Sequence, residues 1–268
     1  MTTTTNSVWV GKRLGLSEKP IEPIHQFQIH DIIPLGNIGG AHIAFTNSAL
    51  LMVATVLVVS GILLVPTAAQ RLVPTRGQLI AEQLFTFVSD MVKSTAGHDA
   101  MKFFPLVFTL FMFILASNWL GLLPYSFTVA SHLIVTVCLA LLVFLTVVIY
   151  GFARNGLKFF KLFVPSGIPW FIIWLVVPIE IISFLSRPVS HSLRLWGNML
   201  AGHIVLKVFG GMVVGLASVG ALGAIAAILP LGMAVALTGL EVLVGGLQAF
   251  VFAVLTCVYL HDAIHPGH

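Results

Sequence analysis

The stretch RPVSHSLRLWGNMLAGH, residues 187–203, lies inside a part of the chain that is otherwise almost wholly apolar. It carries Arg187, His191, Arg194, Asn198 and His203. An arginine near the centre of a bilayer costs about 2.5–3.5 kcal/mol on insertion scales, so such a residue usually has a partner or serves an ion path. We therefore interpret the rest of the chain as a scaffold around Arg194.

The composition indicates an integral membrane protein. The chain has 268 residues, of which 58% are hydrophobic and only 8% charged, whereas a soluble domain carries about 25% charged residues. Its mean hydropathy is +1.06. The net charge of +4 falls in short clusters beside apolar runs, which fits the positive-inside rule better than nucleic-acid binding. Cys138 and Cys257 lie in apolar segments and are predicted to be small buried hydrophobes rather than a disulfide pair.

The amino-terminal half predicts one span followed by an amphipathic helix. Residues 1–40 are polar, contain no apolar core typical of a secretory signal, and are predicted to lie outside. Residues 43–66 are apolar for about the 20 residues that a spanning helix needs. Arg71 and Arg76 follow and mark the cytoplasmic side. In residues 77–100 the apolar side chains recur at helical spacing, which predicts an amphipathic helix on the membrane or against a neighbour.

The remaining spans define the fold class. Residues 103–123 and 133–152 predict two upright spans, and a basic cluster at residues 154–161 places the end of the second in the cytoplasm. Residues 169–210 and 212–264 each exceed the roughly 17–25 residues of one straight span. They predict either two long tilted helices or additional short spans. We expect one all-α, polytopic membrane domain over residues 1–268, with its C-terminus in the cytoplasm.

Polar residues before and after Arg194 fall on one helical face. At about 100° per residue, four of them return to within about 40° of Arg194; they are Glu180, Arg187, Ser190 and Asn198. His203 points to the opposite side. Pro188 could change this phase, because a proline inside a helix can kink it.

The last apolar stretch repeats the pattern. Thr238, Glu241, Gly245 and Gln248 share a face. Glu241 is an isolated carboxylate in an apolar run and needs a partner or water. His203 is a candidate for that partner.

Purely structural roles explain some of these residues equally well. Arg187 could extend its guanidinium to the interface, and His191 is favoured as a core histidine. Asn198 and Gln248 could join helices by hydrogen bonds. His261 and His265 have a spacing that suits a metal, but no further ligand set is evident, and we expect no metal and no cofactor. No nucleotide-binding loop or hydrolase motif is present in the sequence.

The string LRLWGNMLAGH (193–203) resembles the signature of subunit a, the membrane stator of rotary proton-translocating ATP synthases. The resemblance extends to PIHQF (23–27) and covers nearly the whole chain. It includes the spacing of seven polar residues: Glu180, Ser190, Arg194, Asn198, His203, Glu241 and Gln248. A histidine first and a glutamate second, at His203 and Glu241, resemble the alphaproteobacterial and mitochondrial branch. The length and the start of the chain favour a bacterial member.

The resemblance implies a function without catalysis by this chain alone. Two aqueous half-channels would carry protons to and from carboxylates of the c-ring, with Arg194 between them facing the ring. His203 and Glu241 would serve the outer half-channel, and Glu180 with Ser190 the inner one. Asn198 and Gln248 would contact water and side chains near the ring. The implied partners are the c-ring, the peripheral-stalk b subunits and the lipid of the bacterial inner membrane, with no nucleotide or nucleic acid bound.

Three other functions are compatible with intramembrane charges. A secondary transporter or simple proton channel would also carry them, although no inverted repeat is visible. A metal-dependent membrane enzyme would use His261 and His265. A structural assembly anchor would not need Arg194 for coupling.

Overall fold

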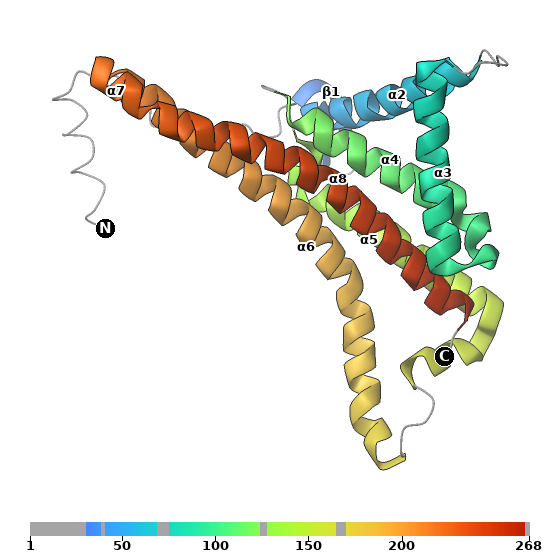
Figure 1. Ribbon diagram of the computed structural model, residues 1–268. Helices are drawn as coiled ribbons and strands as arrows, with labels where there is room; N and C mark the ends of the chain where they lie inside the picture. Colours follow the sequence, from blue (N-terminus) through green and yellow to red (C-terminus); the bar gives the residue numbers. More distant parts are fainter. Residues whose placement is uncertain (1–30, 39–40, 69–74, 124–127, 165–169, 266–268) are drawn as a thin grey trace.

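The protein is described by a computed structural model at residues 31–38, 41–68, 75–123, 128–164 and 170–265 (Figure 1). Five helical segments are long and apolar enough to cross a membrane. Two of these segments consist of a short helix followed directly by a long one. The all-α, polytopic class predicted from the sequence is therefore confirmed for the membrane part. Residues 1–30, which hold most of the predicted outer segment and the PIHQF motif, lie outside the described residues.

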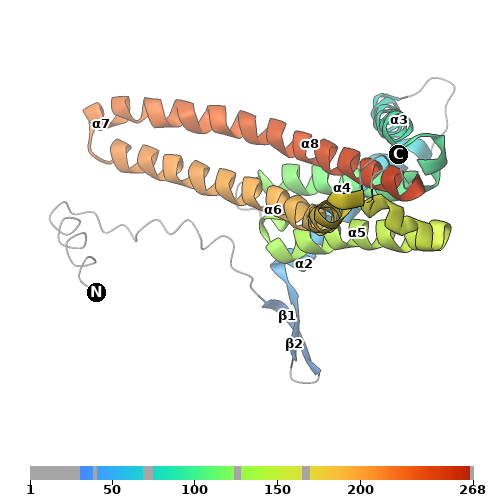
Figure 2. The same ribbon diagram turned by 90° about the horizontal axis from the view of Figure 1, so that it is seen from below.

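A short β-hairpin precedes the first span and was not predicted. Strands β1 (Asp31–Ile38) and β2 (Ala41–Thr46) pair antiparallel, and the hairpin projects away from the helices (Figure 2). The first span, α2 (Asn47–Ala68), begins four residues later than the predicted position 43. The hydroxyl of Thr46 accepts a hydrogen bond from the amide of Ala49 at 3.4 Å, as a helix-capping residue does. This cap sets the helix start, which apolar content alone placed too early.

Helix α3 (Arg76–Ala96) is the predicted amphipathic helix, and it packs against the protein. Its start is capped by the Thr75 hydroxyl, and it ends at Gly97, whose φ of +81° suits glycine. Val88 and Val92 are fully buried, and Phe87 packs against Phe250 of a later helix with ring centroids 5.9 Å apart. Figure 1 shows α3 lying across the ends of neighbouring helices rather than beside them.

Helices α4 (Phe104–Gly121) and α5 (Leu133–Asn155) form an antiparallel pair. A 3-10 helix η2 (His98–Phe103) leads into α4, η3 (Val129–Ser131) leads into α5, and η4 (Gly156–Phe163) follows it. At Gly151 an added Cβ would lie 2.2 Å from a ring carbon of Phe159. Only glycine leaves room for η4 to fold back onto α5 at this position.

The carboxyl-terminal part forms two long helices, which decides between the two predicted options. Helix α6 (Trp170–Ala217) has 48 residues, about 72 Å at 1.5 Å per residue, against a hydrocarbon core of about 30 Å. A short α7 (Ala221–Ala226) joins it to α8 (Ile228–Ile264). Figures 1 and 2 show α6 and α8 side by side in an arm that extends beyond the other helices. Pro230 does not interrupt α8, because it lies in the first turn, where a missing N–H is tolerated.

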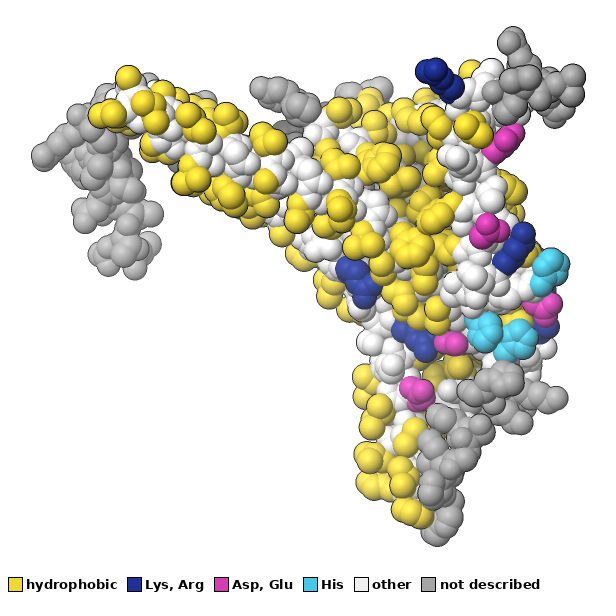
Figure 3. Space-filling model, viewed as in Figure 1, with side chains coloured by type: hydrophobic (Ala, Val, Ile, Leu, Met, Phe, Trp, Pro, Cys, Tyr) yellow, Lys and Arg dark blue, Asp and Glu magenta, His cyan; other side chains and the backbone are white. Residues whose placement is uncertain are grey.

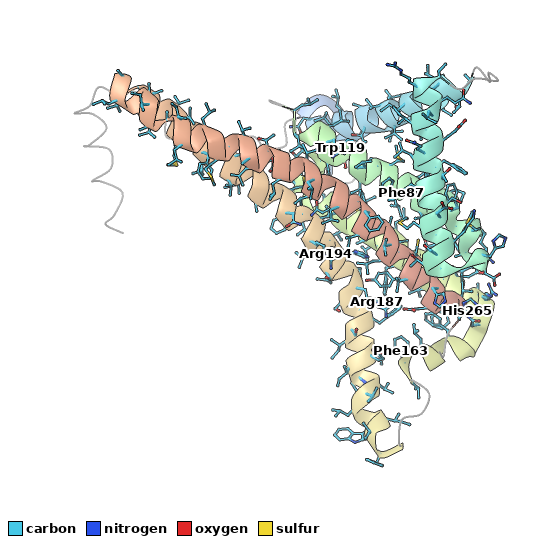
Figure 4. All side chains as sticks on the ribbon, viewed as in Figure 1. Phe87, Trp119, Phe163, Arg187, Arg194 and His265 are labelled. Atoms are coloured by element: carbon cyan, nitrogen blue, oxygen red, sulfur yellow. The ribbon has the colours of Figure 1, made fainter. Side chains whose placement is uncertain are left out.

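Helix α6 remains continuous through Pro178 and Pro188. Figure 1 shows that it changes direction near the labelled Arg187 of Figure 4, close to the second proline, as a kink at proline predicts. The bend brings the middle of α6 against α8 and leaves its first turns apart from the bundle.

The core lies where α4, α5, α6 and α8 cross, and the outer surface is apolar. Val107, Ile114, Ala249 and Ala253 are fully buried there. Many large apolar side chains are exposed, and Figure 3 shows them over the long arm and the middle of the molecule. Such a surface is far larger than a soluble monomer exposes, and together with the five apolar helices it identifies a multi-pass membrane protein.

Candidate functional site

One face of α6 carries the predicted polar stripe toward the outside of the molecule. Ser190, Arg194 and Asn198 are all exposed, as their spacing of four residues in an unbroken helix requires. His203 is only 8% exposed and lies on the opposite side, as predicted. Figure 4 shows Arg194 at the middle of α6, where this helix runs beside α8. Among the described residues no carboxylate lies within ion-pair distance of Arg194.

Gln248 of α8 binds the backbone of α6 at Arg194. Its side-chain Nε2 donates to the carbonyl oxygen of Arg194 at 2.9 Å. Gln248 is buried, so it holds the two helices together instead of lying on the exposed stripe. A hollow of roughly 10 Å³ beside it, lined also by His191 and Leu195, is about the size of one water molecule.

Glu241 is a buried carboxylate in the interface between α8 and α6. It is 6% exposed, and among the described residues neither of its oxygens has a hydrogen-bond donor. The carboxylate lies against Gly202, where an added Cβ would stand 2.0 Å from Oε1. Gly202 therefore provides the space that Glu241 occupies. A buried carboxylate without a donor must hold a proton or contact water, because desolvation penalises the charged form.

His203, the neighbour of Gly202, contacts Thr128. Its Nε2 lies 2.9 Å from the Thr128 hydroxyl, and Thr128 is fully buried just before η3. Because Glu241 lies against Gly202, His203 and Glu241 lie at the same level of the α6–α8 pair. No hydrogen bond joins them in the described structure, since neither oxygen of Glu241 has a partner there, so the expected pairing of His203 with Glu241 is not formed. The sequence singled out both residues but missed Thr128, which lies in a turn without any helical pattern.

Two residues of α4 bind the backbone of α8 beside this cluster. Asn118 is fully buried and its Nδ2 donates to the Gly245 carbonyl at 3.1 Å, while its Oδ1 has no donor among the described residues. Trp119 Nε1 donates to the Val242 carbonyl at 3.2 Å. The close approach is possible because Gly245 has no Cβ, which would otherwise lie 3.3 Å from the Cβ of Asn118. These bonds attach α4 to α8 next to Glu241.

Arg187 leaves the polar stripe and turns to α8. Its Nη1 donates to the Asp262 carboxylate at 3.0 Å, and its guanidinium carbon lies 4.7 Å from the ring centroid of Tyr259. Pro188, next in the chain, marks the bend of α6 that accompanies this change of side. Glu180 is half-buried on the first part of α6, 14 residues before Arg194. The predicted stripe is therefore divided, with Arg187 in an ion pair that the sequence reasoning missed.

His191 lies in the core, as favoured from the sequence. It is 4% exposed and packs its ring against Phe252, with ring centroids 4.7 Å apart. The two cysteines are free; Cys257 is buried, but Cys138 is exposed on α5, so its predicted burial is wrong. Cys138 falls on the side of α5 that no other described helix covers.

No group of three or more His, Cys, Asp or Glu side chains in the described part of the chain could hold a metal ion. His261 and His265 lie one turn apart, with ring centroids at 5.1 Å. They form a pair without a third ligand among these residues.

The similarity of the chain to known proteins shows its family. The family described as ATP synthase A chain matches residues 49–261. The chain belongs to the ATP synthase A chain family. It is 62% identical over 247 residues to ATP synthase subunit a of Rhodopseudomonas palustris. The aligned residues cover 92% of this chain and 99% of that protein. It is 60% identical over 248 residues to the subunit a of Mesorhizobium japonicum, covering 92% and 98%. The same comparison with Nitrobacter hamburgensis gives 59% over 248 residues, covering 92% and 100%.

The family assignment made from LRLWGNMLAGH is thus confirmed, and the match covers all five candidate spans in whole or in part. The signature that carries the assignment, residues 193–203, includes Arg194 on the exposed face of α6 and His203 on the buried face. Residues 193–203 therefore contribute both to the exposed face of α6 and to its buried face.

Proposed function

We propose that the chain is the proton-conducting stator subunit of an ATP synthase, with two aqueous half-channels separated by Arg194. The observation that carries the proposal is the position of Arg194 on the exposed face of α6, unpaired with any carboxylate of the described chain, while Glu241 and His203 lie buried behind it. A permanently charged guanidinium in an apolar span needs a partner from outside. A carboxylate on the c-ring would supply it.

The outer half-channel would run through the buried cluster between α4, α6 and α8. A proton would enter from the outer side, pass Glu241 and His203, and reach a c-ring carboxylate near Asn198. Both Glu241 oxygens lack protein donors in the described structure, which supports contact with water or an exchangeable proton at this position. Thr128 would orient the His203 ring.

The inner half-channel would start at the first part of α6, which stands apart from the bundle. Glu180 lies on that part and Ser190 just after the bend near Pro188, and both would lie on the cytoplasmic side of Arg194. Once protonated, a c-ring carboxylate can move through lipid because the cost of an exposed charge has gone. After nearly a full turn it would release its proton along Ser190 and Glu180. Arg194 would attract the ionised carboxylate and oppose direct passage between the half-channels.

The arrangement also suggests partners and orientation. Five candidate spans would put the two ends of the membrane part on opposite sides, and the basic residues Lys102 and Arg154 favour the cytoplasm for the ends that carry them. The N-terminus would then be outside and the C-terminus inside, in a bacterial inner membrane. The c-ring would face α6, and peripheral-stalk b subunits would contact other helices. The chain would bind no nucleotide and catalyse no reaction alone.

The deciding experiment is proton-driven ATP synthesis in membrane vesicles that carry the whole complex with Arg194→Ala or Arg194→Lys. We expect no synthesis with Arg194→Ala in an assembled complex, together with a passive proton leak through the membrane sector. Lys93→Gln on α3, an exposed lysine remote from α6, is the matched control and should synthesise normally.

Normal coupled synthesis in Arg194→Ala would contradict the proposal and favour a structural anchor. A secondary transporter or simple proton channel would instead move protons in vesicles that contain this chain without the c-ring. If chain-only vesicles conduct protons at the rate of the full membrane sector, the stator role is wrong.

A further inference from the structure

Two exposed cations, one on η2 before α4 and one at the end of α5, bind the same phenol oxygen. Lys102 Nζ donates to the hydroxyl oxygen of Tyr150 at 2.7 Å, and Arg154 Nη1 donates to the same oxygen at 3.1 Å. Arg154 also pairs with Asp99 at 3.3 Å. Both cations are exposed, and only one carboxylate accompanies them, so the cluster keeps a net positive charge.

The hydrogen bonds around Tyr150 leave it ready to donate. A phenol oxygen that accepts two N–H groups directs its own O–H proton away from them. The cluster therefore offers an O–H donor beside ammonium and guanidinium donors. This set of groups suits the oxygens of a phosphate, which form their strongest hydrogen bonds with charged donors.

An apolar groove lies between α2, α4 and α5, and its lining residue Leu106 is about one helical turn along the chain from Lys102. Its volume is about 340 Å³, within the usual range for a ligand site. Its walls come from three helices: Val56, Val59 and Ser60 of α2, Leu106, Thr109, Leu110 and Phe113 of α4, and Leu139 and Leu142 of α5. The Thr109 hydroxyl is bonded to the carbonyl of Pro105 in its own helix, so it offers little polarity to the groove.

The cluster and the groove involve the same part of the chain. The hydrogen bond from Lys102 to Tyr150 joins η2 to α5, and Leu110 and Phe113 of α4 line the groove together with Leu139 and Leu142 of α5. On α5 the groove residues and Tyr150 fall on the same side at about 100° per residue. From Lys102 to Phe113 the helix rises about 16 Å, roughly half of the 30 Å hydrocarbon core. The site therefore has the length of one leaflet, with its charged end at the cytoplasmic interface.

We propose that this site binds one anionic phospholipid of the inner leaflet. Lys102, Tyr150 and Arg154 would hold the headgroup phosphate, and one acyl chain would fill the groove between α2, α4 and α5. The positive charge at one end of the site and the apolar groove at the other favour this occupant. A free phosphate would not need the groove, and a neutral lipid would be bound less strongly by the cations. The site is remote from Arg194, and the proposal does not depend on the proton path.

The test measures phospholipid retained by the purified whole complex. Complexes are equilibrated in nanodiscs of phosphatidylcholine with a minor fraction of phosphatidylglycerol, extracted, and analysed by mass spectrometry for the lipid that remains bound. We expect phosphatidylglycerol to be enriched on the wild type. Tyr150→Phe should weaken its retention by between about two- and tenfold, as the loss of one hydrogen bond predicts, and Lys102→Gln by more. Leu142→Trp should remove it by filling the groove.

Three results would overturn the proposal. Equal retention in Lys102→Gln and in the control Lys93→Gln would show that the cluster is not the headgroup site. Competition by excess inorganic phosphate, with no effect of Leu142→Trp, would indicate a site for free phosphate. A cysteine placed at Leu142 that cross-links to a membrane helix of another subunit would show that protein fills the groove. Assembly of each variant is checked by the amount of complex recovered.

Discussion

Arg187 of α6 and Asp262 of α8 form a 3.0 Å ion pair across 75 positions of sequence, with both side chains about a quarter exposed. The rings of Tyr259 and Phe184 flank the guanidinium at 4.7 and 5.3 Å. The pair thus joins the last turn of α8 to α6 close to where α6 bends. Since Arg187 is occupied there, Arg194 is the arginine of the 187–203 stretch that remains on the exposed face.

Replacing either partner of this pair should weaken the helix contact. We expect Arg187→Ala or Asp262→Ala to destabilise the chain by about 1.5–3 kcal/mol, the range for hydrogen bonds to charged groups. A double-mutant cycle on thermal unfolding of the complex measures the coupling. The exposed pair of Arg154 and Asp99, at 3.3 Å, is the comparison and should show about 0–1 kcal/mol. Equal coupling free energies in the two pairs would contradict the conclusion that Arg187 stabilises the contact between α6 and α8.

Gly202→Ala should disturb Glu241. The added Cβ would meet Oε1 at 2.0 Å and the carboxyl carbon at 2.9 Å, so the carboxylate must move. We expect proton-driven ATP synthesis to fall between about ten- and a hundredfold, because small misplacements of a reacting group have effects of this size. Gly61→Ala on α2, where a Cβ meets nothing within 4 Å, is the control. Helix propensity favours alanine by about 1 kcal/mol at both sites, so a loss at position 202 alone is steric.

Thr128→Val should affect His203 without changing the shape of the turn. The change removes the hydroxyl that lies 2.9 Å from Nε2 and keeps the side-chain volume. We expect proton uptake through the membrane sector to slow by about tenfold, a barrier increase of about 1.4 kcal/mol, and its pH profile to shift. Thr136→Val is matched in burial, but its hydroxyl only bonds Leu133 in its own helix turn. If the two variants take up protons equally fast, Thr128 does not position the histidine.

Gln248→Leu should remove the hydrogen bond to the Arg194 backbone while the complex still assembles. Leucine has a similar size and removes the Nε2 donor to the Arg194 carbonyl together with the unpaired Oε1. Replacing buried polar groups by apolar ones of the same shape is often nearly neutral for stability. We therefore expect normal amounts of complex and several-fold slower ATP synthesis in vesicles. Gln78→Leu, which loses an exposed bond to Glu82, should retain full synthesis. Full synthesis in Gln248→Leu would restrict that residue to helix packing.

Much of the fold was predictable because helices that cross a membrane need long apolar segments, which are visible in the local sequence. Five apolar stretches, a single amphipathic one and the basic residues at their ends gave the class and the order of the helices. The start of α2 was missed by four residues, since a threonine cap decided it. The β-hairpin was missed because its strands lie in a segment without regular alternation.

The candidate site was predictable only in part. Helical periodicity correctly separated exposed Arg194 from buried His203, because both lie on one continuous helix. It misplaced Arg187, because the bend near Pro188 and a distant aspartate draw that side chain away. The buried position of Gln248 at the Arg194 backbone depends on how α8 packs against α6, which no spacing within α8 reveals.

The sequence by itself determined that this is a multi-pass helical membrane protein of the ATP synthase A chain family with an arginine in mid-span. Those properties follow from local composition, periodicity and the cost of charge in lipid. Only the tertiary structure decided that Asp262 pairs with Arg187, that Thr128 contacts His203, and that Gly202 makes room for Glu241. Each joins residues of different elements, and such contacts depend on helix crossing and close packing, which a one-dimensional pattern does not contain.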